Sequence, residues 1–87
     1  MEFDPDKDAE NRRKHGISLG RAADFDLPSS KLTVDDREEY GEERYRAVGF
    51  LDAKLYVLIF TVRRSRYRVI SLRKATREET QDYAERS

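Results

Sequence analysis

The sequence predicts an α+β fold of two N-terminal helices, a four-stranded and mainly antiparallel sheet, and a C-terminal helix, all in a single domain over residues 1–87. Three patterns support this prediction. Helix-end signals bracket short segments before residue 30, apolar residues alternate from residue 31 to about 73, and a capping-box motif follows. Short turns separate the strand segments, so consecutive strands should pair antiparallel, and we expect the helices on one side of the sheet.

The first helix, residues 5–15, is predicted from its ends and not from an apolar stripe. Asp4 is a good N-cap, Pro5 occupies the first helical position, and Gly16 supplies a left-handed stop. The opposite faces of this helix are both polar apart from Ala9, so a polar face must contact the sheet. One of these faces carries four polar side chains, Lys7, Asn11, Lys14 and His15.

A second short helix is predicted after Ser18, an N-cap that follows the hydrophobic Ile17, and it ends at Pro28. Its inward-facing residues are Leu19, Ala22, Ala23 and Phe25. The last helix opens at Thr76 to Glu79, which has the T-x-x-E form of a capping box, and it runs to about Arg86.

Four strands are predicted between these helices. An edge strand contains Leu32 and Val34, and a charged loop follows over residues 35–43. The remaining strands are residues 44–50, 55–62 and 67–73, joined by turns at 51–54 and 63–66. Residues 55–62 are apolar on both faces, which identifies the central strand.

Composition limits the chemistry. Because 41% of the residues are charged and 37% hydrophobic, the core must be thin. There is no cysteine for a disulfide or a zinc-thiolate site, and the clustered carboxylates lack metal-ligand spacing, so we expect no metal and no cofactor. The longest apolar run, Leu55 to Phe60, is too short to cross a bilayer, and the N-terminus has no apolar signal core. We expect a cytoplasmic protein without a membrane partner.

Charge is unevenly distributed. The chain is formally neutral, yet residues 53–74 carry seven basic residues and no acidic one. A neutral protein with its cations on one hairpin can present an anion-binding surface. On the fourth strand, alternation places Tyr67, Val69, Ser71 and Arg73 on one face, and Arg68, Ile70, Leu72 and Lys74 on the other.

The first of these strand faces suits a phosphodiester with a stacked base, because it combines a cation, a hydroxyl and an aromatic ring. A purely structural alternative is that these arginines only form ion pairs. Arg73 would then pair with an acidic residue of the last helix, Glu78, Glu79 or Asp82, and Arg68 with the acidic loop.

Three blocks of sequence resemble the BrnT family of toxins from bacterial type II toxin–antitoxin systems. They are Phe3-Asp4…Lys7…Asn11…Lys14-His15-Gly16-Ile17-Ser18, then Gly41-Glu42-Glu43-Arg44…Gly49, then Arg68-Val69-Ile70-Ser71-Leu72-Arg73-Lys74-Ala75-Thr76…Glu79…Tyr83. Their order and spacing span almost the whole chain. The resemblance implies a RelE-like fold, a metal-independent endoribonuclease activity that inhibits translation, and neutralisation by a cognate antitoxin.

Cleavage of RNA without metal requires proton transfers and stabilisation of charge on the phosphoryl oxygens. Histidine is the side chain whose unperturbed pKa lies nearest neutrality, so His15 is the first candidate for proton transfer, while Lys14, Lys7 or Tyr67 would need a shifted pKa. We therefore predict catalytic roles for His15, Lys14, Arg68 and Arg73. The predicted RNA-binding residues are Lys7, Arg44, Arg63, Arg64, Ser71 and Lys74.

The resemblance also implies partners. We expect a BrnA-like antitoxin with a ribbon-helix-helix part, RNA that is free or on the ribosome, and operator DNA only through the antitoxin complex, since this chain shows no recognition-helix pattern. Two alternatives remain open. One is a non-catalytic RNA- or ribosome-binding module, and the other is a protein-interaction domain whose basic hairpin binds an acidic segment.

Overall fold

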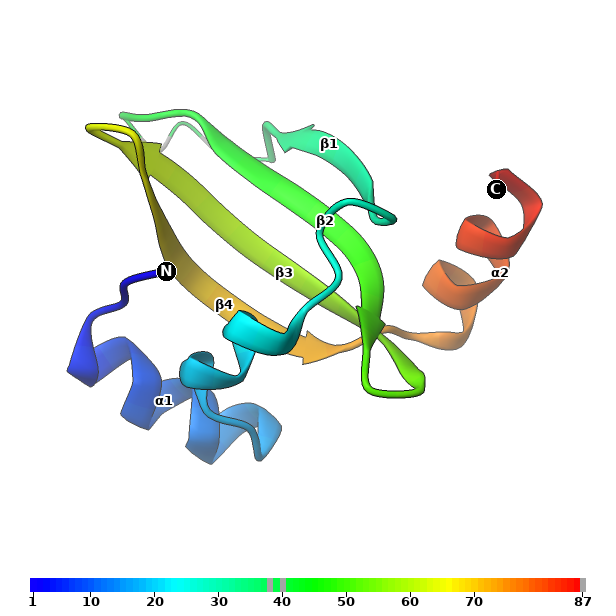
Figure 1. Cartoon of the computed structure of the whole chain (residues 1–87), viewed down its shortest axis with the longest axis horizontal. Helices are drawn as coiled ribbons and strands as arrows, with labels where there is room; N and C mark the ends of the chain where they lie inside the picture. The colour runs from blue at the N-terminus through cyan, green and yellow to red at the C-terminus, as the bar shows by residue number, and fades with distance from the viewer. Residues whose placement is uncertain (38, 40, 87) are drawn as a thin grey trace.

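The strands of the described residues form one antiparallel sheet in the order β1-β2-β3-β4 (Figure 1). The computed structural model describes residues 1–37, 39 and 41–86, so positions 38 and 40 of the predicted acidic loop lie outside the described residues. The elements follow the predicted order: α1 (Pro5–His15), the 3₁₀ helix η1 (Leu19–Asp24), β1 (Lys31–Asp35), β2 (Arg44–Leu51), β3 (Lys54–Arg63), β4 (Arg66–Lys74) and α2 (Arg77–Arg86). The α+β prediction is confirmed.

The predicted end signals act as expected. Asp4 Oδ1 accepts a hydrogen bond from the Asp6 N–H at 2.8 Å, and Gly16 ends α1 with φ of 71°. Ser18 caps η1, which is a single 3₁₀ segment. The β3–β4 turn consists of Arg64 and Ser65, both with positive φ, as a tight hairpin between right-twisted strands requires.

Helices cover both faces of the sheet, which corrects the expectation that they lie on one side. On one face, η1 packs into a core of buried residues: Leu19, Ala22, Phe25, Ala47, Leu51, Leu58, Phe60, Val69 and Leu72. On the other face, Tyr83 of α2 packs against Val48, Val57 and Ile59. Because β3 is apolar on both faces, its second face also needs cover, and α2 supplies it.

A β-bulge in β4 changes which side chains share a face. Ser71 pairs with Ile59 and Val69 pairs with Phe60, so Ile70 is an extra residue in β4. Strict alternation across Ile70 was therefore the wrong prediction. Val69 and Leu72 both face the core beneath η1. The polar side chains Arg68, Ser71 and Arg73 instead share the opposite face.

The outer edge of β4 is closed by residues from the N-terminal segment. Glu2 donates its N–H to the Tyr67 carbonyl at 2.9 Å and accepts from the Val69 N–H at 2.8 Å. Beyond the bulge, the Asn11 side chain forms the hydrogen bonds to this edge. Its Oδ1 accepts from the Leu72 N–H at 3.2 Å, and its Nδ2 donates to the Leu72 carbonyl at 2.8 Å. Asn11 is 5% exposed, so a polar face of α1 does contact the sheet, as predicted.

Neither α1 nor α2, nor any other helix in the described part of the chain, is long and apolar enough to span a membrane.

Replacing Asn11 should destabilise the protein. Asn11→Ala removes the two bonds to Leu72 and a third, from Nδ2 to the Ile17 carbonyl at 2.9 Å, and leaves buried backbone groups without partners. We expect a loss of about 1–3 kcal/mol in the free energy of unfolding, measured by urea titration. Arg13→Ala, on the exposed side of α1, is the control and should change it by less than about 0.5 kcal/mol. Equal effects of the two variants would contradict this role for Asn11.

Candidate functional site

A cavity of about 210 Å³ lies where α1 meets the β4 bulge. Its lining residues are Lys7, Glu10, Asn11, Lys14, His15, Ile70 and Ser71. We call it the α1–β4 cavity. It unites the four polar residues that the sequence placed on one helix face and adds Ser71 from β4. Asn11 has a structural role here, because its amide is bonded to the backbone of β4.

Lys14 forms an ion pair with Glu10, which also lines this cavity. Its Nζ lies 2.6 Å from Oε1 of Glu10, one helical turn earlier, and both side chains are about half exposed. The hydrogen bond from Lys14 lowers the pKa of the Glu10 carboxyl. An anionic ligand in the cavity would therefore compete with Glu10 for Lys14.

A second group of cations lies on the sheet face that also carries Ser71. Arg44 pairs with Thr61, which pairs with Arg68, and Val48 pairs with Val57, which pairs with Arg73. Cross-strand partners share a face. We call Arg44, Arg46, Arg68 and Arg73 the arginine face. Arg46 was not among the predicted site residues, although its spacing of two from Arg44 in a strand signalled a shared face.

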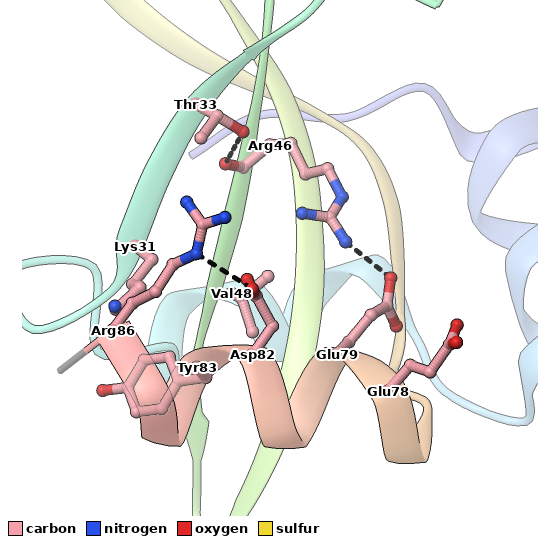
Figure 2. Close-up of a pocket in the computed structure, with 9 residues that line it drawn as sticks. All are labelled: Lys31, Thr33, Arg46, Val48, Glu78, Glu79, Asp82, Tyr83 and Arg86. Carbon is pink, nitrogen blue, oxygen red and sulfur yellow. Dashed lines mark hydrogen bonds and ion pairs between the residues drawn. The ribbon is translucent and has the colours of Figure 1, made fainter.

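Glu79 of α2 binds two residues of the arginine face. Its Oε1 and Oε2 accept hydrogen bonds from Nη1 and Nη2 of Arg73 at 2.8 and 2.9 Å. Its Oε2 also accepts a hydrogen bond from Arg46 at 2.6 Å, which Figure 2 shows. The hydrogen bonds from Arg73 hold the pKa of the Glu79 carboxyl far below its usual range. Arg73 therefore forms the ion pair with the last helix that the structural alternative named.

Beside this contact lies a cavity of about 280 Å³ between α2 and the β1–β2 edge. Figure 2 shows Arg46 extending from β2 toward Glu79 across this space. The lining residues are Lys31, Thr33, Arg46, Val48, Glu78, Glu79, Asp82, Tyr83 and Arg86. The basic side chains of the sheet therefore meet the acidic side chains of α2 here.

The remaining predicted residues lie farther along the sheet. Arg68 pairs with Glu2 at 3.6 Å, and not with the described part of the acidic loop as the structural alternative had it. The β3–β4 turn forms a cationic pocket lined by Glu2, Arg63, Arg64, Arg66 and Arg68. Arg63 also pairs with Glu42 at 2.8 Å. The structure thus places the turn arginines next to Arg68, with the acidic partners close by.

Two residues that the sequence analysis named lie outside both the α1–β4 cavity and the arginine face. Lys74 lines a separate apolar cavity with Phe50 and Tyr83, away from His15. Tyr67 packs against Phe60 at a ring-centroid distance of 5.4 Å, on the core face of β4. Among the described residues, no cluster of three or more His, Cys, Asp or Glu side chains could hold a metal ion.

These groups offer distinct chemical capacities. The α1–β4 cavity holds an imidazole and two ammonium groups, which can exchange protons or bind anions. The arginine face offers guanidinium groups, which are always charged and bind oxyanions through paired N–H groups. Ser71 belongs to both, because it lines the cavity and lies on the same strand face as Arg68 and Arg73.

Acidification should weaken the attachment of α2. Because the pKa of Glu79 is lowered by folding, its contribution to stability is present above the ordinary glutamate pKa of about 4.3 and is lost as the pH falls toward the lowered value. We expect the difference in Tm between wild type and Glu79→Gln, measured by circular dichroism, to narrow below about pH 4. Glu85→Gln, exposed on the same helix, should show no such narrowing. A wild-type advantage that persists unchanged in acid would contradict this assignment.

Comparison with known proteins identifies a family that this chain matches. The family model for the ribonuclease toxin BrnT of type II toxin–antitoxin systems matches residues 3–79, which include α1, the whole sheet and Glu79. No curated protein is a significant match. Because the family model covers most of the 87 residues, this chain belongs to the BrnT family of ribonuclease toxins of type II toxin–antitoxin systems.

Proposed function

We propose that this protein is an endoribonuclease that cleaves RNA without a metal ion and so inhibits translation, on free or ribosome-bound RNA in the cytoplasm. The family supports ribonuclease activity in general. The observation that supports metal-independent cleavage at this site is the β4 bulge. It brings Ser71 into the α1–β4 cavity beside His15 and puts Arg68 and Arg73 on the face of β4 that carries Ser71.

The proposed reaction is an internal transesterification. The 2′-oxygen attacks the adjacent phosphorus, the bond from phosphorus to the 5′-oxygen breaks, and a cyclic phosphate and a 5′-hydroxyl result. His15 transfers one of the two protons in this scheme, removing it from the 2′-hydroxyl or delivering it to the 5′-oxygen. Arg68 and Arg73 stabilise the charge that develops on the non-bridging oxygens. Lys14 is a second candidate for proton transfer, provided that substrate releases it from Glu10.

The proposed RNA path runs from the β3–β4 turn to the α1–β4 cavity. Arg63, Arg64 and Arg66 at the turn would attract the backbone, and Lys7 would contact a phosphate within the cavity. The turn pocket also favours the alternative of a non-catalytic RNA- or ribosome-binding module, because its arginines lie apart from His15. Intact RNA in the presence of a bound, toxic protein would support that alternative.

Family membership implies an antitoxin partner. We propose a BrnA-like antitoxin with a ribbon-helix-helix part that supplies operator binding for the complex. Exposed apolar side chains support the need for a covering partner, since Leu32 and Val34 of β1 are 54% and 53% exposed. Apolar residues of an antitoxin segment would complement this surface, and acidic residues would complement the cations elsewhere on the protein.

Expression of the chain alone should arrest growth and fragment cellular RNA. Purified protein should cleave a mixed RNA pool at low salt in the presence of a chelator, as read by gel, and His15→Ala should lose at least about 100-fold in rate. Co-expression of a BrnA-like antitoxin should suppress both effects. An RNA pool that stays intact with and without ribosomes would refute the enzymatic proposal.

Substitutions along the path should differ in kind. Arg68→Ala and Arg73→Ala should lower kcat/KM by about 100-fold, because these strand side chains are about 30% exposed and held in place. Arg63→Ala and Arg64→Ala at the turn should mainly weaken RNA binding. The slope of the logarithm of the binding constant against the logarithm of the salt concentration should become shallower by about 0.7 for each phosphate that the variant no longer binds. Thermal unfolding controls for folding. Equal losses from all four substitutions would indicate a diffuse binding patch.

A further inference from the structure

Two arginines from different strands converge on one carboxylate. Arg46 lies on β2 and Arg73 on β4, with β3 between them, yet both reach Glu79 at 2.6 to 2.9 Å. The Arg46 and Arg73 side chains are 30% and 31% exposed, and Glu79 is 17% exposed. The sheet therefore presents two guanidinium groups to a single anion.

This arrangement fits a phosphodiester as well as a carboxylate. Both anions offer two oxygens on one centre, and the guanidinium fork binds either of them through paired N–H groups. We propose that Arg46 and Arg73 form a backbone-phosphate subsite for RNA, and that Glu79 is an internal competitor that occupies this subsite until RNA displaces it. This inference rests on the proposed function, in which RNA is the substrate. It adds Arg46 and Glu79 to the residues that act on RNA.

The attachment of α2 allows such an exchange. All ten residues of α2 are described, and none of them is buried. Besides the Glu79 contacts, Tyr83 holds α2 on the sheet. Its hydroxyl donates to the Ser29 carbonyl at 3.0 Å, its ring makes an edge contact with Phe50, and the same ring packs against Val48, Val57 and Ile59. Rotation of the Glu79 side chain or a small shift of α2 would free both guanidinium groups.

Space for the incoming phosphate exists beside Glu79. The cavity of about 280 Å³ between α2 and the β1–β2 edge is lined by Arg46 and, farther along, by Lys31 and Thr33 (Figure 2). A phosphate entering there would approach Arg46 first and Arg73 as Glu79 leaves. Because no residue of α2 is buried, the exchange requires no unfolding of the sheet.

Glu79→Gln removes the competing charge and tests the competition directly. In the wild type, Glu79 Oε1 accepts a hydrogen bond from the Thr76 N–H at 2.8 Å. The side-chain oxygen of glutamine can accept the same bond, so the variant retains the capping box. Glu78→Gln is the matched control, since it removes the same charge from the neighbouring exposed position of α2. The probe is a short single-stranded oligodeoxynucleotide, which carries phosphodiesters but no 2′-hydroxyl and cannot be cleaved by the proposed reaction.

We expect Glu79→Gln to bind this probe about five- to tenfold more tightly than wild type by fluorescence anisotropy at low salt, with a steeper salt dependence. Glu78→Gln should improve binding by no more than about twofold. The double variant Arg46→Gln/Glu79→Gln should lose most of the gain. Equal or weaker binding by Glu79→Gln relative to Glu78→Gln would overturn the inference, because Glu79 would then not compete with the ligand.

Arg46→Gln on the wild-type background provides a second measurement if Glu79→Gln does not fold. It should weaken probe binding more than Arg13→Gln on the exposed side of α1, and equal effects would overturn the subsite. The outcomes for the two proposals are separable. Wild type that cleaves RNA while Glu79→Gln gains no affinity refutes only the subsite. Wild type that cleaves no RNA while Glu79→Gln gains affinity for the probe refutes only the nuclease.

Discussion

The two hydrogen bonds between the Asn11 side chain and the backbone of Leu72 are the constraint on which the rest of the structure depends. They close the outer edge of β4 beyond the residues that Glu2 contacts, and they hold against the sheet a helix that has almost no apolar surface. A side-chain amide can do this because it offers the donor and the acceptor that a neighbouring strand would offer. Docking α1 in this way also places His15 and Lys14 beside β4.

The bulge at Ile70 is the second determinant of the site. If Ile70 were paired regularly and β4 had no bulge, alternation would separate Arg68 and Arg73 onto opposite faces of β4. With it, Val69 and Leu72 both enter the core, and Arg68, Ser71 and Arg73 share the other face. The gain in apolar burial on one face is thus coupled to the gathering of polar groups on the other.

Local compensation of charge explains how so many cations coexist in a small, formally neutral chain. Each of several basic residues has a nearby carboxylate, as in the pairs Lys14–Glu10, Arg68–Glu2, Arg63–Glu42 and Arg73–Glu79. These pairs lower the electrostatic repulsion that the basic hairpin would otherwise impose on the fold. They also mean that an anionic ligand replaces internal partners and does not simply enter a vacant cationic surface.

The sequence by itself determined the local elements. Asp4, Gly16, Ser18 and the Thr76–Glu79 box mark helix ends through backbone hydrogen bonds between near neighbours, and apolar alternation marks the strands. The family resemblance was likewise readable from residue order. Tertiary structure alone decided that α2 covers the second face, that β4 bulges, and that Glu79 joins Arg46 to Arg73. These features depend on register and on contacts between distant segments, where core packing overrides the strand period that a single sequence displays.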